Sequence, residues 1–208
     1  MIKVFFGNVS ALQDVAASGE LYSSLPRWRR EITDSIKSNK EKLLSAGAGL
    51  LLAPALAVFG IDARAAAVKR AEHGKPYLVD YPNIHFSLSH SGEMVMCAVA
   101  DAPIGCDIQR IQGAHISVAK RFFTSDEQKH IYMSDDAQTE FVRIWVLKES
   151  YVKLTGDGIA ACPLTSFEVL STKSPNNAVF YEYCLSGYRA AVCCEHADNI
   201  VWQSIRLA

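Results

Sequence analysis

The sequence predicts an α+β fold that consists of two similar halves. Segments that alternate apolar and polar residues, as half-buried strands do, occur in both halves of the chain. Each half also contains one long apolar helix, followed by a Ser-Gly turn and an apolar strand, at Ser91-Gly92 and again at Ser186-Gly187. A duplicated unit of about 100 residues accounts for this echo, and we place the boundary near Asp101, between residues 1–101 and 102–208.

The strands of the first half are separated by tight turns. Alternation and apolar runs predict strands at Met1 to Gly7, His85 to His90, Met94 to Ala100 and Ile104 to Ile108, with further short strands between Thr165 and Leu207. Because only short turns separate the second, third and fourth of these segments, we expect them to form a three-stranded meander.

Helix-starting and helix-ending residues mark the predicted helices. We expect helices that begin near Leu25 and near Lys42, one from Ile116 to Tyr132 with an interruption near Phe123, and one from Phe141 to Leu154. Pro26 suits a first helical turn. Thr124 or Ser125 is placed to cap a new helix, with Glu127 in its first turn. Gly156-Asp-Gly158 ends the last helix.

Composition and charge exclude several classes of protein. The chain has 208 residues, half of them apolar, and a net charge of −1, so bulk charge does not indicate nucleic acid as a partner. The six cysteines form no CxxC pair and no zinc pattern with histidine, and most lie in apolar runs. We interpret them as reduced core residues of a cytoplasmic protein.

One apolar segment approaches the length of a membrane span. No charged residue occurs from Leu43 to Ile61, but glycines, a proline and several alanines interrupt this stretch. It therefore predicts a buried core helix followed by a turn. The N-terminus lacks the pattern of a signal peptide, and we expect no membrane association.

The helix from Phe141 to Leu154 carries charged residues in an apolar setting. Helical spacing puts Trp145, Glu149 and Lys153 on one face. An ordinary i,i+4 ion pair explains Glu149 and Lys153 when they are taken alone. However, the rest of the helix is apolar enough to be buried, and buried charges need partners or a ligand.

A second carboxylate occurs on a predicted strand. Asp107 and Gln109 are two residues apart, so they point to the same side of the strand. A turn cap is the ordinary role of such an aspartate. A strand carboxylate opposite the Glu149 carboxylate would instead suit Mg²⁺, which is held by one or two carboxylates together with substrate phosphates and water.

Two further groups of residues suit an anionic ligand. Ser87 to Gly92 offers hydroxyls and an imidazole beside a glycine turn, which either contact phosphate or form a polar hairpin tip. Cations precede this segment, and a solvated helix face explains most of them: Arg27, Arg29, Arg30, Lys40, Lys42, Lys69, Arg70 and Lys75.

These motifs resemble a known family. Phe86-Ser-Leu-Ser-His90, Ile104-Gly-Cys-Asp107 and Trp145-Val-Leu-Lys-Glu-Ser-Tyr-Val-Lys153 resemble, in order and spacing, the three signatures of Sfp-type (surfactin-synthetase-activating) 4'-phosphopantetheinyl transferases. Gly74-Lys-Pro76 and Arg121 to Glu127 are similar to further parts of that family. The resemblance implies two similar halves related by a pseudo-twofold axis, with the active site and coenzyme A between them.

The resemblance also implies roles for the charged residues. Asp107 and Glu149 match the family's metal ligands, and Lys153 matches the lysine that contacts the pyrophosphate. The family's second signature usually continues G-x-D-x-E, but Gln109 stands here in place of the glutamate. Since an amide is neutral, we expect Gln109 to remain a ligand of Mg²⁺ or Mn²⁺ but to bind the metal more weakly.

Other matched positions would bind coenzyme A. Ser89 and His90 match phosphate-contacting residues, Lys75 and Pro76 match the adenine-side loop, and Lys42 matches a basic residue near the 3′-phosphate. The implied reaction is attack of a carrier-protein serine on the β-phosphate, with release of 3′,5′-ADP. We expect Glu149 to take the serine proton, Lys153 to neutralise developing charge, and Asp107 to hold the metal.

The partner is expected to be an apo acyl or peptidyl carrier protein with an acidic recognition helix. Lys120, Arg121 and Lys129 are candidates for steering it. Because two halves in one chain fill the interface that a homodimer would supply, we expect a monomer. Two alternatives remain open: a catalytically impaired coenzyme A-binding protein, with Gln109 as the lesion, and a domain whose motifs are accidental.

Overall fold

The structure is a computed structural model that describes residues 1–12, 20–113, 115–170 and 174–207. Its strands are β1 (Ile2–Asn8), β2 (Val68–Arg70), β3 (Pro76–Leu78), β4 (His85–Ser91), β5 (Met94–Ala100), β6 (Ile104–Arg110), β7 (Val179–Leu185), β8 (Tyr188–Cys194) and β9 (Ile200–Ser204). Its α-helices are α2 (Glu20–Ser24), α3 (Arg27–Ser35), α4 (Asn39–Leu50), α5 (Leu52–Ala57), α6 (Ala119–Phe122), α7 (Ser125–Met133), α8 (Ala137–Thr155) and α9 (Gly158–Ala161). Short 3₁₀ helices are η1 (Val9–Leu12), η2 (Ile116–Val118), η3 (Leu164–Ser166) and η4 (Pro175–Asn177).

Two sheets of the same topology form the centre of the molecule. One has the strand order β4-β5-β1-β9 and the other has the order β6-β8-β7. In the first sheet β1 and β4 both pair antiparallel with β5, and in the second sheet β6 and β7 both pair antiparallel with β8. Gly92 and Gly187 have positive φ angles in the two hairpin turns, where the sequence echo lies. The predicted α+β fold of two similar halves is confirmed.

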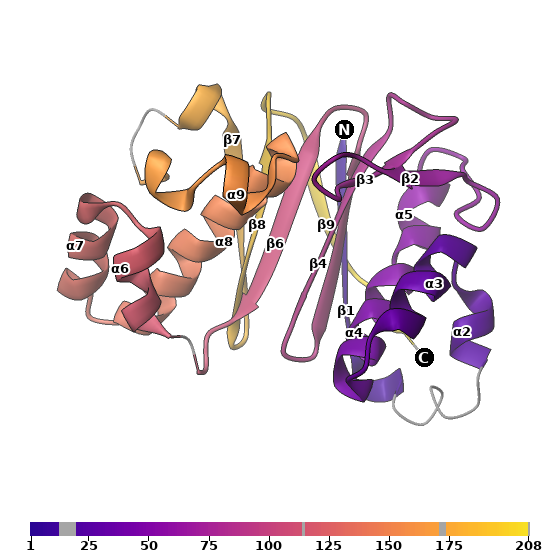
Figure 1. The fold of residues 1–208 in the computed structure, drawn as a ribbon, viewed down its shortest axis with the longest axis horizontal. Coiled ribbons are helices and arrows are strands. Elements are labelled where there is room, and N and C mark those ends of the chain that lie inside the picture. The colour runs from indigo at the N-terminus through magenta and orange to yellow at the C-terminus, as the bar shows by residue number, and fades with distance from the viewer. Residues whose placement is uncertain (13–19, 114, 171–173, 208) are drawn as a thin grey trace.

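The sheets face each other and helices cover their outer sides. Figure 1 shows α2 to α5 on one side of the strands and α6 to α9 on the other. Strand β5 is buried along its whole length because alternate residues face the opposite sheet and the helices α4 and α5. The core between the sheets consists of Ile2, Val4, Phe6, Met94, Met96, Ala98 and Ala100 from the first and Ile104, Cys106, Ile108, Ala190, Val192 and Cys194 from the second.

The expected three-stranded meander is wrong in its third strand. Strand β5 already has β4 on one edge and β1 on the other, so β6 cannot join it and instead begins the second sheet beside β8. Strand β9 then returns to the first sheet and pairs parallel with β1. The chain passes from the first sheet to the second beside Asp101. The predicted division into residues 1–101 and 102–208 assigns β9 to the second half, although β9 pairs in the first sheet, and this division stays a prediction.

A row of serine hydroxyls joins the two sheets at their adjoining edges. Ser87, Ser89 and Ser91 of β4, here called the serine ladder, accept hydrogen bonds from alternate backbone N–H groups of β6. The distances from the amide nitrogens of Cys106, Ile108 and Arg110 to the hydroxyl oxygens are 3.0, 3.3 and 3.1 Å. Since both strands have a period of two, every second residue of β4 meets every second N–H of β6.

The predicted helix boundaries are largely confirmed. Pro26 is the N-cap of α3, Thr124 and Glu127 form a capping box at the start of α7, and Gly156, with φ of 78°, ends α8. The apolar segment after Lys42 forms α4 and α5, and no described helix is long and apolar enough to cross a membrane. All six cysteines are free thiols, and Cys97, Cys106, Cys193 and Cys194 are buried.

Candidate active site

The site is built where α8 lies directly against β6. Gly105 makes this approach possible, because a Cβ atom there would lie 2.0 Å from the carbonyl oxygen of Ser150 and 2.3 Å from the amide nitrogen of Leu154. The next residue on the same side of β6 is Asp107, and it therefore faces α8. The glycine of the Gly-x-Asp motif thus brings the helix within reach of the aspartate.

Asp107 is held by three side chains from three elements. Lys153 Nζ of α8 lies 2.7 Å from Asp107 Oδ1, and the Ser89 hydroxyl of β4 donates to the same oxygen at 2.6 Å. Gln109 Nε2 donates to Asp107 Oδ2 at 3.2 Å. Asp107 is only 1% exposed, so its carboxylate has a fixed position.

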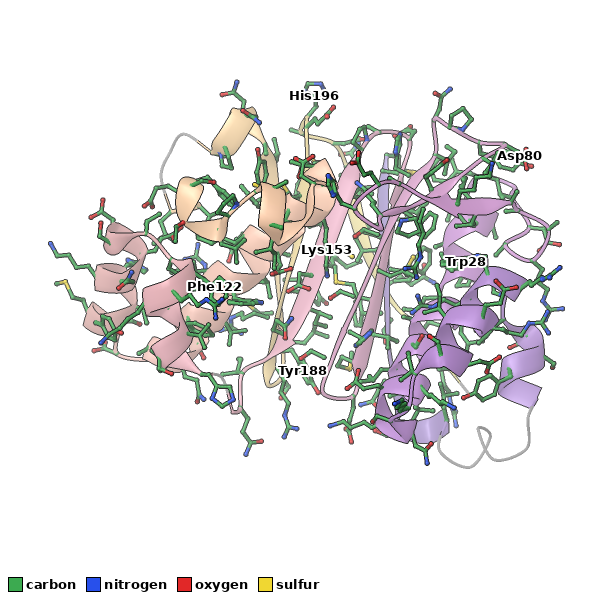
Figure 2. All side chains as sticks on the ribbon, in the orientation of Figure 1. Trp28, Asp80, Phe122, Lys153, Tyr188 and His196 are labelled. Carbon is green, nitrogen blue, oxygen red and sulfur yellow. The ribbon has the colours of Figure 1, made fainter. Side chains whose placement is uncertain are left out.

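Lys153 remains a cation in this setting. Burial lowers the pKa of its ammonium group, but the charge and hydrogen bond of Asp107, together with smaller contributions that include the charge of Glu149, raise the pKa overall. In Figure 2, Lys153 lies between the helices of the two halves. Its side chain is 30% exposed, so the ammonium group can also meet a ligand in the adjoining cleft.

Glu149 contributes a second carboxylate next to this ion pair. Burial raises its pKa, and the charge of Asp107 raises it further, while Lys153 acts in the opposite direction. Among the described residues, none donates a hydrogen bond to the Glu149 carboxylate, which lines the cleft. It is therefore a poorly stabilised anion that a cation or a proton would stabilise.

Basic side chains of the first half line the same cleft. Arg29 and Arg70 share with Glu149 and Lys153 a cavity of about 370 Å³ between the two halves. Burial, followed by the positive charge of Arg70, lowers the pKa of Arg29 to about 10. Of the cations that the sequence singled out, Arg29, Arg70 and Lys75 therefore line the same cavity as Glu149, where an anion would compensate their charge.

The remaining predicted coenzyme A contacts are placed at different distances from the cleft. Lys75 and Pro76 line it. His90 is half-buried on β4, and burial lowers its pKa. The Ser89 hydroxyl is occupied by Asp107 and by the N–H of Ile108. Lys42 lies on α4 and is not among the residues that line this cavity. The roles of these residues in binding remain predictions.

Glu127, which the sequence placed in the first turn of a new helix, has a structural role in that position. Its carboxylate forms an ion pair with Lys148 at 2.8 Å, and both side chains are fully buried. It also accepts hydrogen bonds from the backbone N–H groups of Thr124 and Val169. Sequence reasoning missed Lys148, although a lysine in an apolar helix is itself a signal of a buried cation.

Trp145 packs against the core of the second half. Its ring centroid lies 5.7 to 6.1 Å from those of Phe122, Phe123 and Phe141. It therefore fixes α8 against α6 and the segment that follows α6. Gln109 and Trp145 both line a neighbouring cavity of about 450 Å³, which lies on the side of Asp107 that faces Gln109.

The side chains present fit a hard divalent cation that a substrate helps to bind. The described residues contain no group of three or more His, Cys, Asp or Glu side chains that would hold a metal alone. They do provide two carboxylates, of which Glu149 is destabilised by the charge of Asp107, and the neutral amide of Gln109. This donor set matches the coordination preference of Mg²⁺, which binds one or two carboxylates and completes its coordination shell with substrate phosphates and water.

Comparisons with known proteins point to one family. The family model of the 4'-phosphopantetheinyl transferase superfamily matches residues 103–205. A 4'-phosphopantetheinyl transferase of Bacillus subtilis is 34% identical over 165 residues, which are 72% of this chain and 72% of that protein. The 4'-phosphopantetheinyl transferase Sfp of Bacillus subtilis strain 168 is 38% identical over 61% of this chain and 62% of its own length.

Two further proteins match part of this chain. The 4'-phosphopantetheinyl transferase HetI of Nostoc sp. is 34% identical over 73% of this chain and 65% of its own length. The crystal structure of the Thermotoga maritima holo-[acyl-carrier-protein] synthase matches 44% of this chain and 61% of its own, with a TM-score of 0.39 and 16% identity.

Proposed function

This chain belongs to the 4'-phosphopantetheinyl transferase superfamily, and from this premise we propose how its cleft performs the transfer. The chain moves the 4'-phosphopantetheine group of coenzyme A onto a serine of an apo carrier protein and releases 3′,5′-ADP. The observation that carries this proposal is the meeting of the Asp107–Lys153 ion pair, the Glu149 carboxylate and two arginines at one cleft between the halves.

The cationic side of the cleft binds the anionic end of coenzyme A. Arg29 and Arg70 are close enough to repel each other, so a phosphate between them relieves the repulsion. Lys153 presents its ammonium group to the diphosphate and neutralises the charge that develops on its oxygens. Lys75 and Pro76, at the start of β3, form the wall of the cleft beside them.

The carboxylate side of the cleft would hold the metal. Asp107 and Glu149 would bind Mg²⁺, or Mn²⁺, with the amide oxygen of Gln109 as a further, neutral ligand. The bound ion would offset negative charge on the phosphate oxygens. Ser89 keeps the Asp107 carboxylate in place through its 2.6 Å hydrogen bond.

Glu149 is the base that takes the proton of the attacking serine. Its carboxylate lines the cleft and receives no hydrogen bond from the described residues, so it is available to accept a proton there. Lys153 lies four residues later on the same helix face and stays charged, which holds a positive charge near the phosphate of the leaving 3′,5′-ADP.

The first test uses Asp107→Asn and apo acyl carrier protein. The amide keeps an acceptor for Ser89 and Lys153, whereas alanine would leave the half-buried Lys153 ammonium without its partner. Because the charge of Asp107 is lost, we expect transfer to fall about 10²–10³-fold. Mass spectrometry of the carrier after incubation with coenzyme A and Mg²⁺ measures the gain of one phosphopantetheine group.

The controls separate the possible outcomes. Wild-type chain that binds coenzyme A without modifying any apo carrier would contradict the transferase assignment and favour an impaired binding protein. Full activity in the Asp107→Asn variant would instead contradict only the role of Asp107 in holding the metal.

We propose that the carrier protein approaches near α6 and α7. Lys120, Arg121 and Lys129 are exposed on these helices, which form one end of the molecule in Figure 1, and they suit an acidic recognition helix. Because exposed charges are screened by salt, the KM for the carrier should rise several-fold between about 0.05 and 0.5 M NaCl. Steady-state assays with a near-neutral carrier as control would show no such rise if the steering is electrostatic. A monomer in the cytoplasm remains part of the proposal.

A further inference from the structure

The ammonium group of Lys75 is bound to the backbone of the opposite half. Lys75 Nζ donates to the carbonyl oxygen of Leu154 at 2.7 Å and to that of Ile104 at 3.2 Å. Lys75 precedes β3 in the first half, whereas Leu154 is in the last turn of α8 and Ile104 is the first residue of β6. One side chain thus connects the first half to the two elements that carry the site.

The aliphatic part of the Lys75 side chain is also in contact with the opposite half. A Cβ atom at Gly156 would lie 3.0 Å from Lys75 Cδ, so the stem lies directly over the glycine that ends α8. Burial lowers the pKa of Lys75 to about 8, and the charges of Glu195 and Asp157 only partly offset this. Within the described residues, no carboxylate forms an ion pair with Lys75. Its ammonium group instead donates to two backbone carbonyls, and one of them, that of Leu154, lies at the C-terminus of α8, where the helix dipole favours a cation.

The two acceptors lie close to the catalytic ion pair along the chain. Leu154 directly follows Lys153, and Ile104 lies three residues before Asp107 on the same strand. Gly105, which follows Ile104 on β6, allows α8 to approach β6 closely, but it has no side chain that could bind the helix. The two hydrogen bonds of Lys75, here called the Lys75 bridge, bind the end of α8 to the start of β6.

We propose that Lys75 is a positioning residue that holds the C-terminal end of α8 against β6. It thereby keeps Lys153 and Glu149 in place relative to Asp107. Two of the three N–H groups of its ammonium are engaged by protein carbonyls, which distinguishes this role from the coenzyme A contact expected of this position. The proposal rests on the proposed function for its effect on turnover, but not for its effect on the helix.

The test compares Lys75→Met with Lys75→Arg. Methionine retains a flexible apolar stem over Gly156 but removes the donors, and arginine restores a cationic donor. Lys69→Met is the matched control, because Lys69 is exposed on the adjacent strand β2 and does not line the cleft. For each variant we would measure thermal unfolding, hydrogen exchange of the peptide covering residues 150–158, the Kd of coenzyme A by calorimetry, and kcat and KM.

The expected result separates positioning from ligand contact. Loss of the bridge removes about 1.4 kcal/mol of hydrogen bonding, so in Lys75→Met the end of α8 should exchange about tenfold faster. We expect kcat to fall at least about tenfold, while the Kd of coenzyme A changes less than about threefold, since its charged contacts remain. Lys75→Arg should recover part of both losses, and Lys69→Met should leave all four measurements unchanged.

Two outcomes would overturn the proposal. One is unchanged exchange of residues 150–158 in Lys75→Met; the other is a tenfold weaker Kd for coenzyme A with an unchanged kcat. If Lys75→Met does not fold, Lys75→Arg decides by the same comparison of exchange, Kd and kcat. Absence of transfer by the wild-type chain would contradict the proposed function, but exchange and coenzyme A binding would still test the bridge.

Discussion

The Glu149→Gln variant is expected to lose about 10²–10⁴-fold in the rate of phosphopantetheine transfer, while its metal-free fold is at least as stable as that of the wild type. Glutamine keeps the shape of the side chain but cannot accept the serine proton and contributes no charge to a metal. The loss of rate therefore follows from the proposed roles of Glu149 as base and metal ligand.

The gain in stability follows from the raised pKa of Glu149. Because the folded-state pKa lies above that of an unfolded glutamate, the protonated side chain favours folding, and stability is lost as pH rises through the unfolded value toward the folded one. At neutral pH an unfolded glutamate is ionised, whereas burial and the charge of Asp107 disfavour ionisation of Glu149 in the folded wild type; the variant has no such difference. At pH below the unfolded value both proteins should have similar stability.

Thermal unfolding of both proteins at about pH 3.5 and pH 7, without metal, measures this difference. Adding Mg²⁺ and coenzyme A should raise the Tm of the wild type more than that of the variant, because ligands stabilise the state that binds them. A Glu149→Gln variant that is inactive but clearly less stable than wild type at pH 7 would contradict the description of Glu149 as a poorly stabilised anion.

The Lys148→Met variant is expected to be destabilised by about 3–5 kcal/mol, which corresponds to a fall in Tm of roughly 10 °C for a chain of this size. Lys148 is fully buried, pairs with Glu127, and donates at 2.6 Å to the carbonyl oxygens of Leu164 and Phe167. Its ammonium also lies 4.5 Å from the ring centroid of Phe167. Methionine would fill the space but leave a buried carboxylate and two carbonyls without their donor.

A double-mutant cycle tests whether the pair causes the loss. Glu127→Gln should recover part of the stability when it is added to Lys148→Met, because no uncompensated charge is then buried. Lys129→Met, on the exposed face of α7, is the control and should change Tm very little. If Lys148→Met unfolds at the wild-type temperature, the buried ion pair does not contribute to stability.

Residue spacing predicted much of the candidate site because the site depends on local periodicity. Glu149 and Lys153 share a helix face, and Asp107 and Gln109 share a strand face, whatever the rest of the fold is. Gly105 was visible as part of a motif, but its purpose, the close contact with α8, required knowing that α8 crosses β6. Asp107, Glu149 and Lys153 are brought together in the structure, and their chemical roles stay predictions until they are tested.

Features that depend on distant partners could not be predicted in the same way. The hydroxyls of Ser87 to Gly92 suit either a phosphate or a polar hairpin tip when the sequence is considered alone, but in the structure Ser87 and Ser89 accept backbone N–H groups of β6. Nothing local indicates that two sheet edges adjoin there. Likewise, Lys75 has the same local sequence context whether its ammonium meets a nucleotide or the carbonyl of Leu154.

The return of β9 to the first sheet has a consequence for synthesis on the ribosome. Strand β1 is synthesised first, but its parallel neighbour β9, at residues 200–204, is synthesised only after β6, β7 and β8. Until then, one edge of β1 is open to incorrect pairing, and the two halves cannot mature one after the other as separate folding units. The nascent chain must therefore keep an incomplete sheet while nearly all of its length is translated.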